Sequence, residues 1–299
     1  MNEIVRLDNI CQYNELMGQE TLHPLISVLD LSKSSPKEYT RISFGFYAIY
    51  LKEVKCGDLR YGRNYYDYQE GTLVFLAPGQ VIGIDRKGDY YQPKGWALMF
   101  HPDLIRGTSL GRNIKNYTFF SYEVNEALHL SEHERHIAID CMNNIKDELS
   151  LGIDKHSRTL IVSNIELFLN YCMRFYDRQF ITRENVNKDV LVKFENLLDD
   201  YFQTEKPQII GLPSVAYCAD QLHLSANYLG DLIKKESGKS AQEHIQLKLM
   251  DIAKEKVLDT SKSVSEIAYE LGFKYPQHFS RLFKKRVGYT PNEYRLQNE

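Results

Sequence analysis

The 299-residue sequence lacks the features that mark a membrane protein or a disulfide-stapled domain. No segment approaches the ~18 consecutive apolar residues of a membrane-spanning helix, so we expect no membrane partner. The first ten residues carry acids and no apolar stretch, which predicts that no signal peptide is present. The five cysteines are scattered, and no pair has the CxxC spacing of zinc or redox motifs. We therefore expect reduced thiols and a cytoplasmic protein.

An excess of basic residues is also missing, because the formal net charge is −3. For the chain as a whole this charge argues against a nucleic-acid partner, but its distribution is uneven. From Pro207 to Glu299 there are 13 Lys and Arg against 11 Asp and Glu. Between Gly272 and Arg295 there are six basic residues and one acid. The basic charge is concentrated near the C-terminal end, where contact with phosphates would require it.

What the sequence does contain is one pattern that occurs twice in its last third. A shift of 49 and then 50 positions aligns the two copies. Matched pairs are Ser214 with Ser263, Ala219 with Ala268, Leu222 with Leu271, Lys234 with Lys284 and Gly238 with Gly288. A repeat of this length indicates two copies of one supersecondary unit. Each copy predicts a helix, a tight turn and a second helix.

Capping boxes predict where the helices around this repeat begin. They occur at residues 240–243, 263–266 and 290–293, each pairing Ser or Thr with Glu three positions later. The helix that opens at Ser240 extends to about Leu258 and joins the two copies. Its ~19 residues span roughly 28 Å. That length is compatible with two recognition helices in successive major grooves, about 34 Å apart.

The second copy resembles a known family. The residues Glu266–Phe273 (EIAYELGF), Phe279–Lys285 (FSRLFKK), Gly288, Thr290-Pro291 and Glu293–Arg295 are similar to the AraC-type DNA-binding domain. The resemblance covers about Asn187 to Gln297. It implies an all-α domain of seven helices, which form two helix-turn-helix units. The first of the seven helices is Asp189–Phe202. We expect this domain at residues 187–299, a first domain at residues 1–185, and a linker at residues 185–188.

Carried onto this sequence, the resemblance places DNA-reading residues at the starts of the two second helices. They are Ser225, Ala226, Asn227, Tyr228 and Asp231 in the first unit, and Pro276, Gln277, His278, Ser280 and Arg281 in the second. Lys234, Lys235, Lys284 and Lys285 are placed for phosphates. Gln277 and Arg281 suit adenine and guanine, whereas a carboxylate at Asp231 accepts only from cytosine, so we expect the second unit to dominate. Alternatively, such units pack in bundles that bind only protein, and the lysines form a solvated face.

The N-terminal two-thirds predict strands followed by helices. Strands are expected at residues 44–50, 72–76 and 95–100, with a turn at 77–80. Their spacing indicates a barrel or jelly roll over about residues 1–125. Helices are expected at 133–150 and 157–177, within about residues 131–178. Glu70-Gly71 and Pro78-Gly79 resemble half of a cupin motif. The whole is an α+β multidomain fold: a cupin-like β-barrel or jelly roll with trailing helices, then the all-α domain.

A metal site and an enzyme activity are not expected. Enzymatic cupins hold a metal with a His-x-His pair, a later Glu and a further His, whereas Tyr65–Tyr68 stand where imidazoles belong. We expect no metal and no cofactor. We expect His101 to have a structural role at a strand end. We expect exposed side chains near a helix start for His129, His133 and His136. A cupin isomerase or dioxygenase fused to a DNA-binding tail is the alternative enzyme hypothesis.

The combined expectation is a sequence-specific transcriptional regulator in the bacterial cytosol. Its partners would be double-stranded promoter DNA, a second copy of the chain and RNA polymerase, with a small-molecule effector in the N-terminal domain. The apolar helix 157–177 would supply the homodimer interface, unless the barrel and the preceding helix cover it. A DNA-binding module without an effector, regulated by its abundance alone, remains a further hypothesis. The sequence names no ligand-binding residues.

Overall fold

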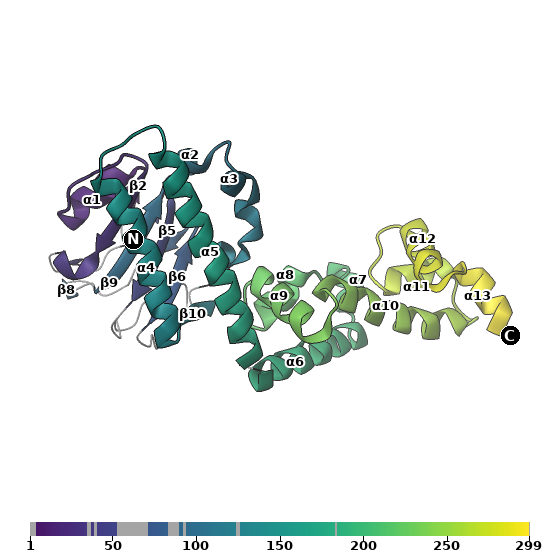
Figure 1. The fold of residues 1–299 in the computed structure, drawn as a ribbon. Coiled ribbons are helices and arrows are strands. Elements are labelled where there is room, and N and C mark those ends of the chain that lie inside the picture. The colour runs from purple at the N-terminus through teal and green to yellow at the C-terminus, as the bar shows by residue number, and fades with distance from the viewer. Residues whose placement is uncertain are drawn as a thin grey trace. The chain divides into compact units, whose positions relative to one another are not determined.

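The computed structural model describes residues 4–34, 37–38, 41–52, 71–82, 90–91, 94–123, 126–182 and 184–298. The chain divides into two compact units, residues 1–182 and 183–299. The first unit is rich in strands, and the described part of the second is helical (Figure 1). This is the predicted α+β arrangement, with a β-rich part followed by a helical part. Tyr65–Tyr68 and Glu70 lie outside the described residues.

The largest sheet of the first unit has five antiparallel strands in the order β10-β6-β5-β9-β2. The strands are β2 Ile26–Asp30, β5 Tyr47–Lys52, β6 Thr72–Leu76, β9 Gly95–Phe100 and β10 Leu128–His129. A second sheet joins β1 Ile4–Leu7, β4 Arg41–Phe44 and β7 Val81–Ile82, with β1 parallel to β4. Strands β3 Lys37–Glu38 and β8 Tyr90–Tyr91 form a separate pair.

The predicted bounds of β6 and β9 are confirmed, but the strand expected at residues 44–50 is wrong. The chain bends at Gly45, so that β4 ends at Phe44 and β5 begins at Tyr47. A Cβ atom at Gly45 would lie 2.9 Å from the carbonyl oxygen of Asp8, and the Gly45 amide donates to Leu7 at 2.8 Å. Backbone passing this close to Gly45 separates the two strands, a contact that strand propensity alone does not reveal.

Both faces of the five-stranded sheet are buried, as the alternation of side chains along its strands requires. One face belongs to a core cluster that includes helix α1 (Ile10–Met17) and the residues Phe44, Ala48, Tyr50, Val74, Leu76, Ala97 and Met99. Helices α4 (Glu132–Ser150) and α5 (Ser157–Thr182) lie side by side across the other face (Figure 1). There, the ring of Phe75 lies 4.4 Å from Phe119, which stacks on Tyr176 of α5.

Short helices complete this unit, and one of them decides the role of His101. Helices α2 (Pro102–Ile105) and α3 (Ser109–Asn113) follow β9. The His101 side chain caps α2, because its Nδ1 accepts from the Asp103 amide at 3.2 Å. This is the structural role that the sequence predicts. His133 and His136 are exposed, but the expectation for His129 is wrong, since it is half-buried in β10.

Helix α5 holds the edge strand β10 in place through two neighbouring side chains. Gln179, which is buried, accepts from the His129 amide at 2.8 Å and donates to the Ala127 carbonyl at 3.3 Å. Arg178 donates to both carboxylate oxygens of Glu134, at 3.0 and 2.6 Å, and to the His129 carbonyl at 2.7 Å. Because these bonds cross between α4, α5 and the sheet, they fix the three elements together.

The second unit contains eight helices within residues 184–298, one more than the resemblance implies. They are α6 Glu184–Gln203, α7 Lys206–Ile210, α8 Val215–Gln221, α9 Ala226–Ser237, α10 Ala241–Leu258, α11 Val264–Glu270, α12 Pro276–Val287 and α13 Pro291–Asn298. The additional helix is α7. The segment expected as a linker, residues 185–188, lies within the start of α6. It is polar but has no Gly or Pro to interrupt a helix. Within the described residues, no helix combines the length and the apolarity that crossing a bilayer takes.

The ion pair between α4 and α5 can be tested by removing Arg178. We expect Arg178→Ala to lower the free energy of unfolding of the full chain by about 2 kcal/mol, because the Glu134 carboxylate is left without its charged donor. Asn144→Ala is the matched control, since Asn144 is exposed on α4 away from the pair and should change stability by less than about 0.5 kcal/mol. Chemical denaturation followed by circular dichroism measures both. Equal effects would show that the pair contributes nothing.

Candidate DNA-binding surface

The first helix-turn-helix unit consists of α8, a tight turn and α9. Ser214 caps α8, and its Oγ accepts from the Tyr217 amide at 3.1 Å. The turn is closed by the Leu224 amide, which donates to the Ala219 carbonyl at 2.9 Å. In this turn His223 adopts a left-handed backbone conformation with φ of 58°, which residues other than glycine seldom adopt. Ser225 then caps α9.

The second unit repeats this geometry in α11, its turn and α12. The Phe273 amide donates to the Ala268 carbonyl at 2.9 Å, the same bond at the matching positions. Gly272, with φ of 91°, stands where the first copy has His223. The predicted capping boxes are confirmed at Ser240, Ser263 and Thr290, whose amides each donate to the carboxylate of the Glu three positions later at 2.7–2.8 Å. The sequence repeat is therefore a repeat of structure.

Each second helix buries one face and exposes the other. In α9 the buried side chains are Leu229, Leu232 and Ile233, and in α12 they are Phe279 and Phe283. The second helix-turn-helix unit packs in a core cluster with α10 and the end of α6. The cluster includes Tyr201, Leu249, Ala253, Ile267 and Leu271. The opposite faces of α9 and α12 carry most of the predicted DNA-contacting residues.

The structure leaves most of these side chains accessible. Ala226, Asn227, Lys234, Lys235, Gln277, His278, Arg281, Lys284 and Lys285 are exposed, and Ser225, Asp231, Pro276 and Ser280 are half-buried. Tyr228 is a correction, because its side chain is only 7% exposed and packs inward. The sequence predicts an accessible first turn of α9, but one position of that turn faces the interior of the domain. We therefore expect the exposed side chains of α9, rather than Tyr228, to reach DNA.

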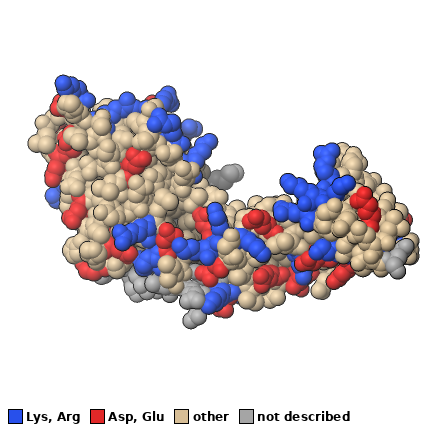
Figure 2. Space-filling view, turned by 45° about the vertical axis from the view of Figure 1, so that its right-hand side comes forward, with Lys and Arg blue, Asp and Glu red and all other residues tan. Residues whose placement is uncertain are grey.

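The basic residues near the C-terminal end do not all reach this surface. Arg295 donates to three backbone carbonyls, those of Val257, Asp259 and Lys262, and so fastens the end of α10 to α13. Arg286 is hydrogen-bonded to Gln246 of α10. Lys274, which is not among the predicted DNA-contacting residues, is exposed in the turn before α12. Figure 2 shows Lys and Arg gathered on the upper side of the helical unit and acids mostly along its lower side.

The two helix-turn-helix units are joined by α10, which has 18 residues. A helix of that length spans about 27 Å. Its first turn is fixed by Ser240 and Glu243, and its last turn by the bonds from Arg295. The helix therefore acts as a capped spacer between the two units.

Residues 218–297 match a family model described as "Helix-turn-helix domain". The C-terminal unit is an AraC-type helix-turn-helix domain. The chain is 32% identical to a Bacillus subtilis protein named "Uncharacterized HTH-type transcriptional regulator YtdP" over 114 residues, which are 38% of this chain. It is 40% identical to "Uncharacterized transcriptional regulatory protein YesN" from the same organism over 78 residues, which are 25% of this chain. The chain spans only 15% and 21% of the length of these relatives, so the likeness concerns the AraC-type domain.

Solved structures also resemble the AraC-type domain. The C-terminal domain of AraT, a response regulator from Geobacillus stearothermophilus, is 28% identical to this chain with a TM-score of 0.32. The match covers 36% of this chain and 84% of that one.

The left-handed turn of the first unit can be tested by substitution. We expect His223→Gly to raise the free energy of unfolding by about 0.5–1 kcal/mol, because glycine adopts a positive φ without the steric cost that a Cβ atom imposes. Ala216→Gly, at an exposed position within α8, is the control and should lower stability by about 1 kcal/mol. Urea denaturation of the full chain measures both. A loss of stability in His223→Gly would mean that the histidine side chain contributes more than its backbone strain costs.

Proposed function

We propose that the chain is a sequence-specific DNA-binding regulator of transcription. The observation that carries the proposal is the pair of helix-turn-helix units in the AraC-type domain, each with an accessible face on its second helix. Such a face enters a major groove and reads base edges, while flanking lysines contact phosphates. Two units joined by a spacer helix suit two successive grooves on one side of a duplex. The protein would act in the bacterial cytosol, where promoter DNA and RNA polymerase are its partners.

The second unit is proposed as the main reader of sequence. Gln277 and Arg281 lie one turn apart on the exposed side of α12, and they suit adenine and guanine respectively. Lys284 and Lys285 follow them and would neutralise phosphates. In the first unit Asn227 and Ala226 remain candidates, whereas Asp231 offers only an acceptor. Ser225, Pro276, His278 and Ser280 border the same two helix starts.

The direct experiment is a selection of duplexes by the purified full-length chain. A library of randomised double-stranded DNA is passed over the protein at moderate salt, and the retained duplexes are sequenced. Enrichment of a common motif supports the proposal. Retention of DNA without a motif contradicts sequence-specific binding, and retention of none favours a domain that binds only protein.

Substitutions in α12 then separate base reading from phosphate contact. We expect Arg281→Ala to weaken binding to the selected duplex by about 1–3 kcal/mol and to leave binding to a scrambled duplex nearly unchanged. Lys285→Ala is the matched control from the same helix. It should weaken both duplexes alike and reduce the salt dependence of binding by about one unit of slope. Fluorescence anisotropy titrations at several salt concentrations measure both effects. If Arg281→Ala weakened both duplexes equally, Arg281 would be a phosphate contact.

We propose further that the N-terminal unit is a cupin-like barrel that senses a small molecule. Two-sided burial of the five-stranded sheet and the aromatic core around Phe44 and Tyr50 support this fold. The bonds from Arg178 and Gln179 to β10 would couple the sheet to α5. A ligand that binds only the folded unit would raise its melting temperature in proportion to the logarithm of the ligand concentration.

A homodimer through α5 is proposed from a stripe of exposed side chains along that helix. Leu160, Leu167, Arg174 and Ile181 follow one another at intervals of seven residues. The three apolar members are 47%, 46% and 63% exposed. A seven-residue apolar spacing is the pattern with which two helices pack along a common seam. The stripe therefore supports pairing of α5 with α5 of a second copy.

The stripe can be tested through the mass of the protein in solution. We expect Leu167→Glu to convert the dimer to a monomer at micromolar concentration, because two carboxylates would meet at the seam. Leu151→Glu is the control, since Leu151 is also exposed but lies at the end of α4, outside the stripe. Sedimentation equilibrium of the full chain gives the mass. A dimer that survives Leu167→Glu would place the interface elsewhere, and a monomeric wild type would exclude a homodimer.

A further inference from the structure

The second helix-turn-helix unit also contacts the segment that leads into the first unit. The turn after α11 lies against the segment of residues 206–212, which comprises α7 and the start of the loop to α8; we name this segment the brace. A Cβ atom at Gly272 would lie 2.7 Å from the Pro207 carbonyl oxygen, 2.9 Å from the Gly211 carbonyl carbon and 3.1 Å from the Leu212 nitrogen. A Cβ atom would collide with these backbone atoms, so the two segments lie this close only because residue 272 is glycine.

The brace is held by the end of α6, beside α8. The hydroxyl of Tyr201, near the end of α6, donates to the Gly211 carbonyl at 2.7 Å. Tyr201 is only 1% exposed, and its ring lies 5.2 Å from that of Tyr217 in α8. Within the brace, the Gly211 amide donates to the Pro207 carbonyl at 2.9 Å. The atom that Gly272 approaches most closely is therefore already fixed by a hydrogen bond.

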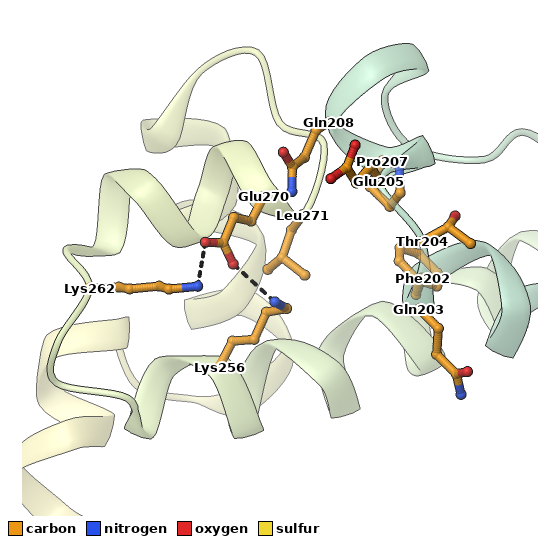
Figure 3. Close-up of a pocket in the computed structure, with 10 residues that line it drawn as sticks. All are labelled: Phe202, Gln203, Thr204, Glu205, Pro207, Gln208, Lys256, Lys262, Glu270 and Leu271. Carbon is orange, nitrogen blue, oxygen red and sulfur yellow. Dashed lines mark hydrogen bonds and ion pairs between the residues drawn. The ribbon is translucent and has the colours of Figure 1, made fainter.

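The turn at Gly272 is held equally firmly from the side of the second unit. Glu270, at the end of α11, accepts from Lys262 at 2.5 Å and from Lys256 of α10 at 2.9 Å (Figure 3). These hydrogen bonds, that from Lys262 first, keep the pKa of Glu270 below its ordinary value of 4.5. Leu271 is buried beside them. A pocket of about 340 Å³ lies between Glu270 and residues 203–208, and the backbone contact at Gly272 lies beside it.

We propose that the brace fixes the separation of the two DNA-reading helices and thereby makes the protein select duplexes by the spacing of their two recognition sequences. The inference rests on the proposed function. Helix α10 connects the two units, and the contact of the second unit with the brace, which leads into α8, closes a loop. Inserting one base pair moves a recognition sequence about 3.4 Å along the duplex and turns it about the axis. A closed loop of packed helices does not follow such a shift without breaking contacts.

The first test measures the free protein and needs no DNA. Spin labels are placed at Lys234→Cys of α9 and Lys284→Cys of α12, both exposed, with Cys11 and Cys56 replaced by serine; Cys141, Cys172 and Cys218 are buried. Double electron–electron resonance then gives the distribution of distances. We expect a narrow distribution in the otherwise unchanged chain and a broader one in Gly272→Ala, whose methyl group would push the brace away.

Gly288→Ala is the matched control for this test. Gly288 has φ of 93°, close to the 91° of Gly272, but an added Cβ atom would meet nothing within 4 Å. Both variants thus carry the same backbone strain, and only one disturbs the brace. Tyr201→Phe loosens the brace by removing one hydrogen bond, and it decides the question if Gly272→Ala does not fold. The proposal would be overturned if the distance distribution of Gly272→Ala were as narrow as that of Gly288→Ala. If Gly272→Ala does not fold, the same comparison is made with Tyr201→Phe.

The second test measures spacing on DNA. In the duplex selection we expect the unchanged chain to enrich two sequence blocks at one spacing, with about a tenfold loss of affinity when one base pair is inserted between them, comparable to one mismatched pair. Gly272→Ala should enrich the same blocks at several spacings, and Gly288→Ala at one. A single spacing in Gly272→Ala would refute spacing selection by the brace. If no variant enriched any motif, the proposed function would fail, whereas the resonance measurement would still report on the brace.

Discussion

The tight turn between the two helices of each helix-turn-helix unit is the constraint on which the candidate DNA-binding surface depends. One residue in each turn takes a left-handed conformation, His223 in the first unit and Gly272 in the second. The next amide then returns to the first helix, at Ala219 or Ala268, and the second helix can begin at once. Because the turn is so short, the start of the second helix projects from the unit with its side chains accessible. The first copy accepts a steric cost at His223 that the second avoids with glycine.

Glycine at position 272 serves a second purpose that the first copy does not share. Its missing side chain lets the backbone of the second unit lie against residues 207–212. The matching residue in the first unit carries a full side chain at the same backbone conformation, so this need for space belongs to the second turn alone. A conformational preference and a packing requirement therefore coincide at one residue.

In the N-terminal unit, burial of both sheet faces decides which surfaces remain available. Helix α1 and the second sheet enclose one face, while α4, α5 and the aromatic residues after α3 cover the other. Gln179 and Arg178 use the inner side of α5 to hold β10. The outer side of α5 then retains Leu160, Leu167 and Ile181, whose exposure has no explanation within the unit itself. An apolar stripe of this kind is typical of a surface that pairs with another helix.

The sequence by itself determined the elements whose causes are local. The repeat, the capping boxes and the apolar spacing located α8 to α13, and the strands β6 and β9, because helix starts and buried faces are written in residues a few positions apart. Tertiary structure alone decided what depends on distant partners. It bent the chain at Gly45 against Asp8, turned Tyr228 inward, assigned Arg295 to carbonyls more than 30 positions away and added α7 beneath Gly272. Those outcomes require two segments to approach in space, and no pattern within either segment records that approach.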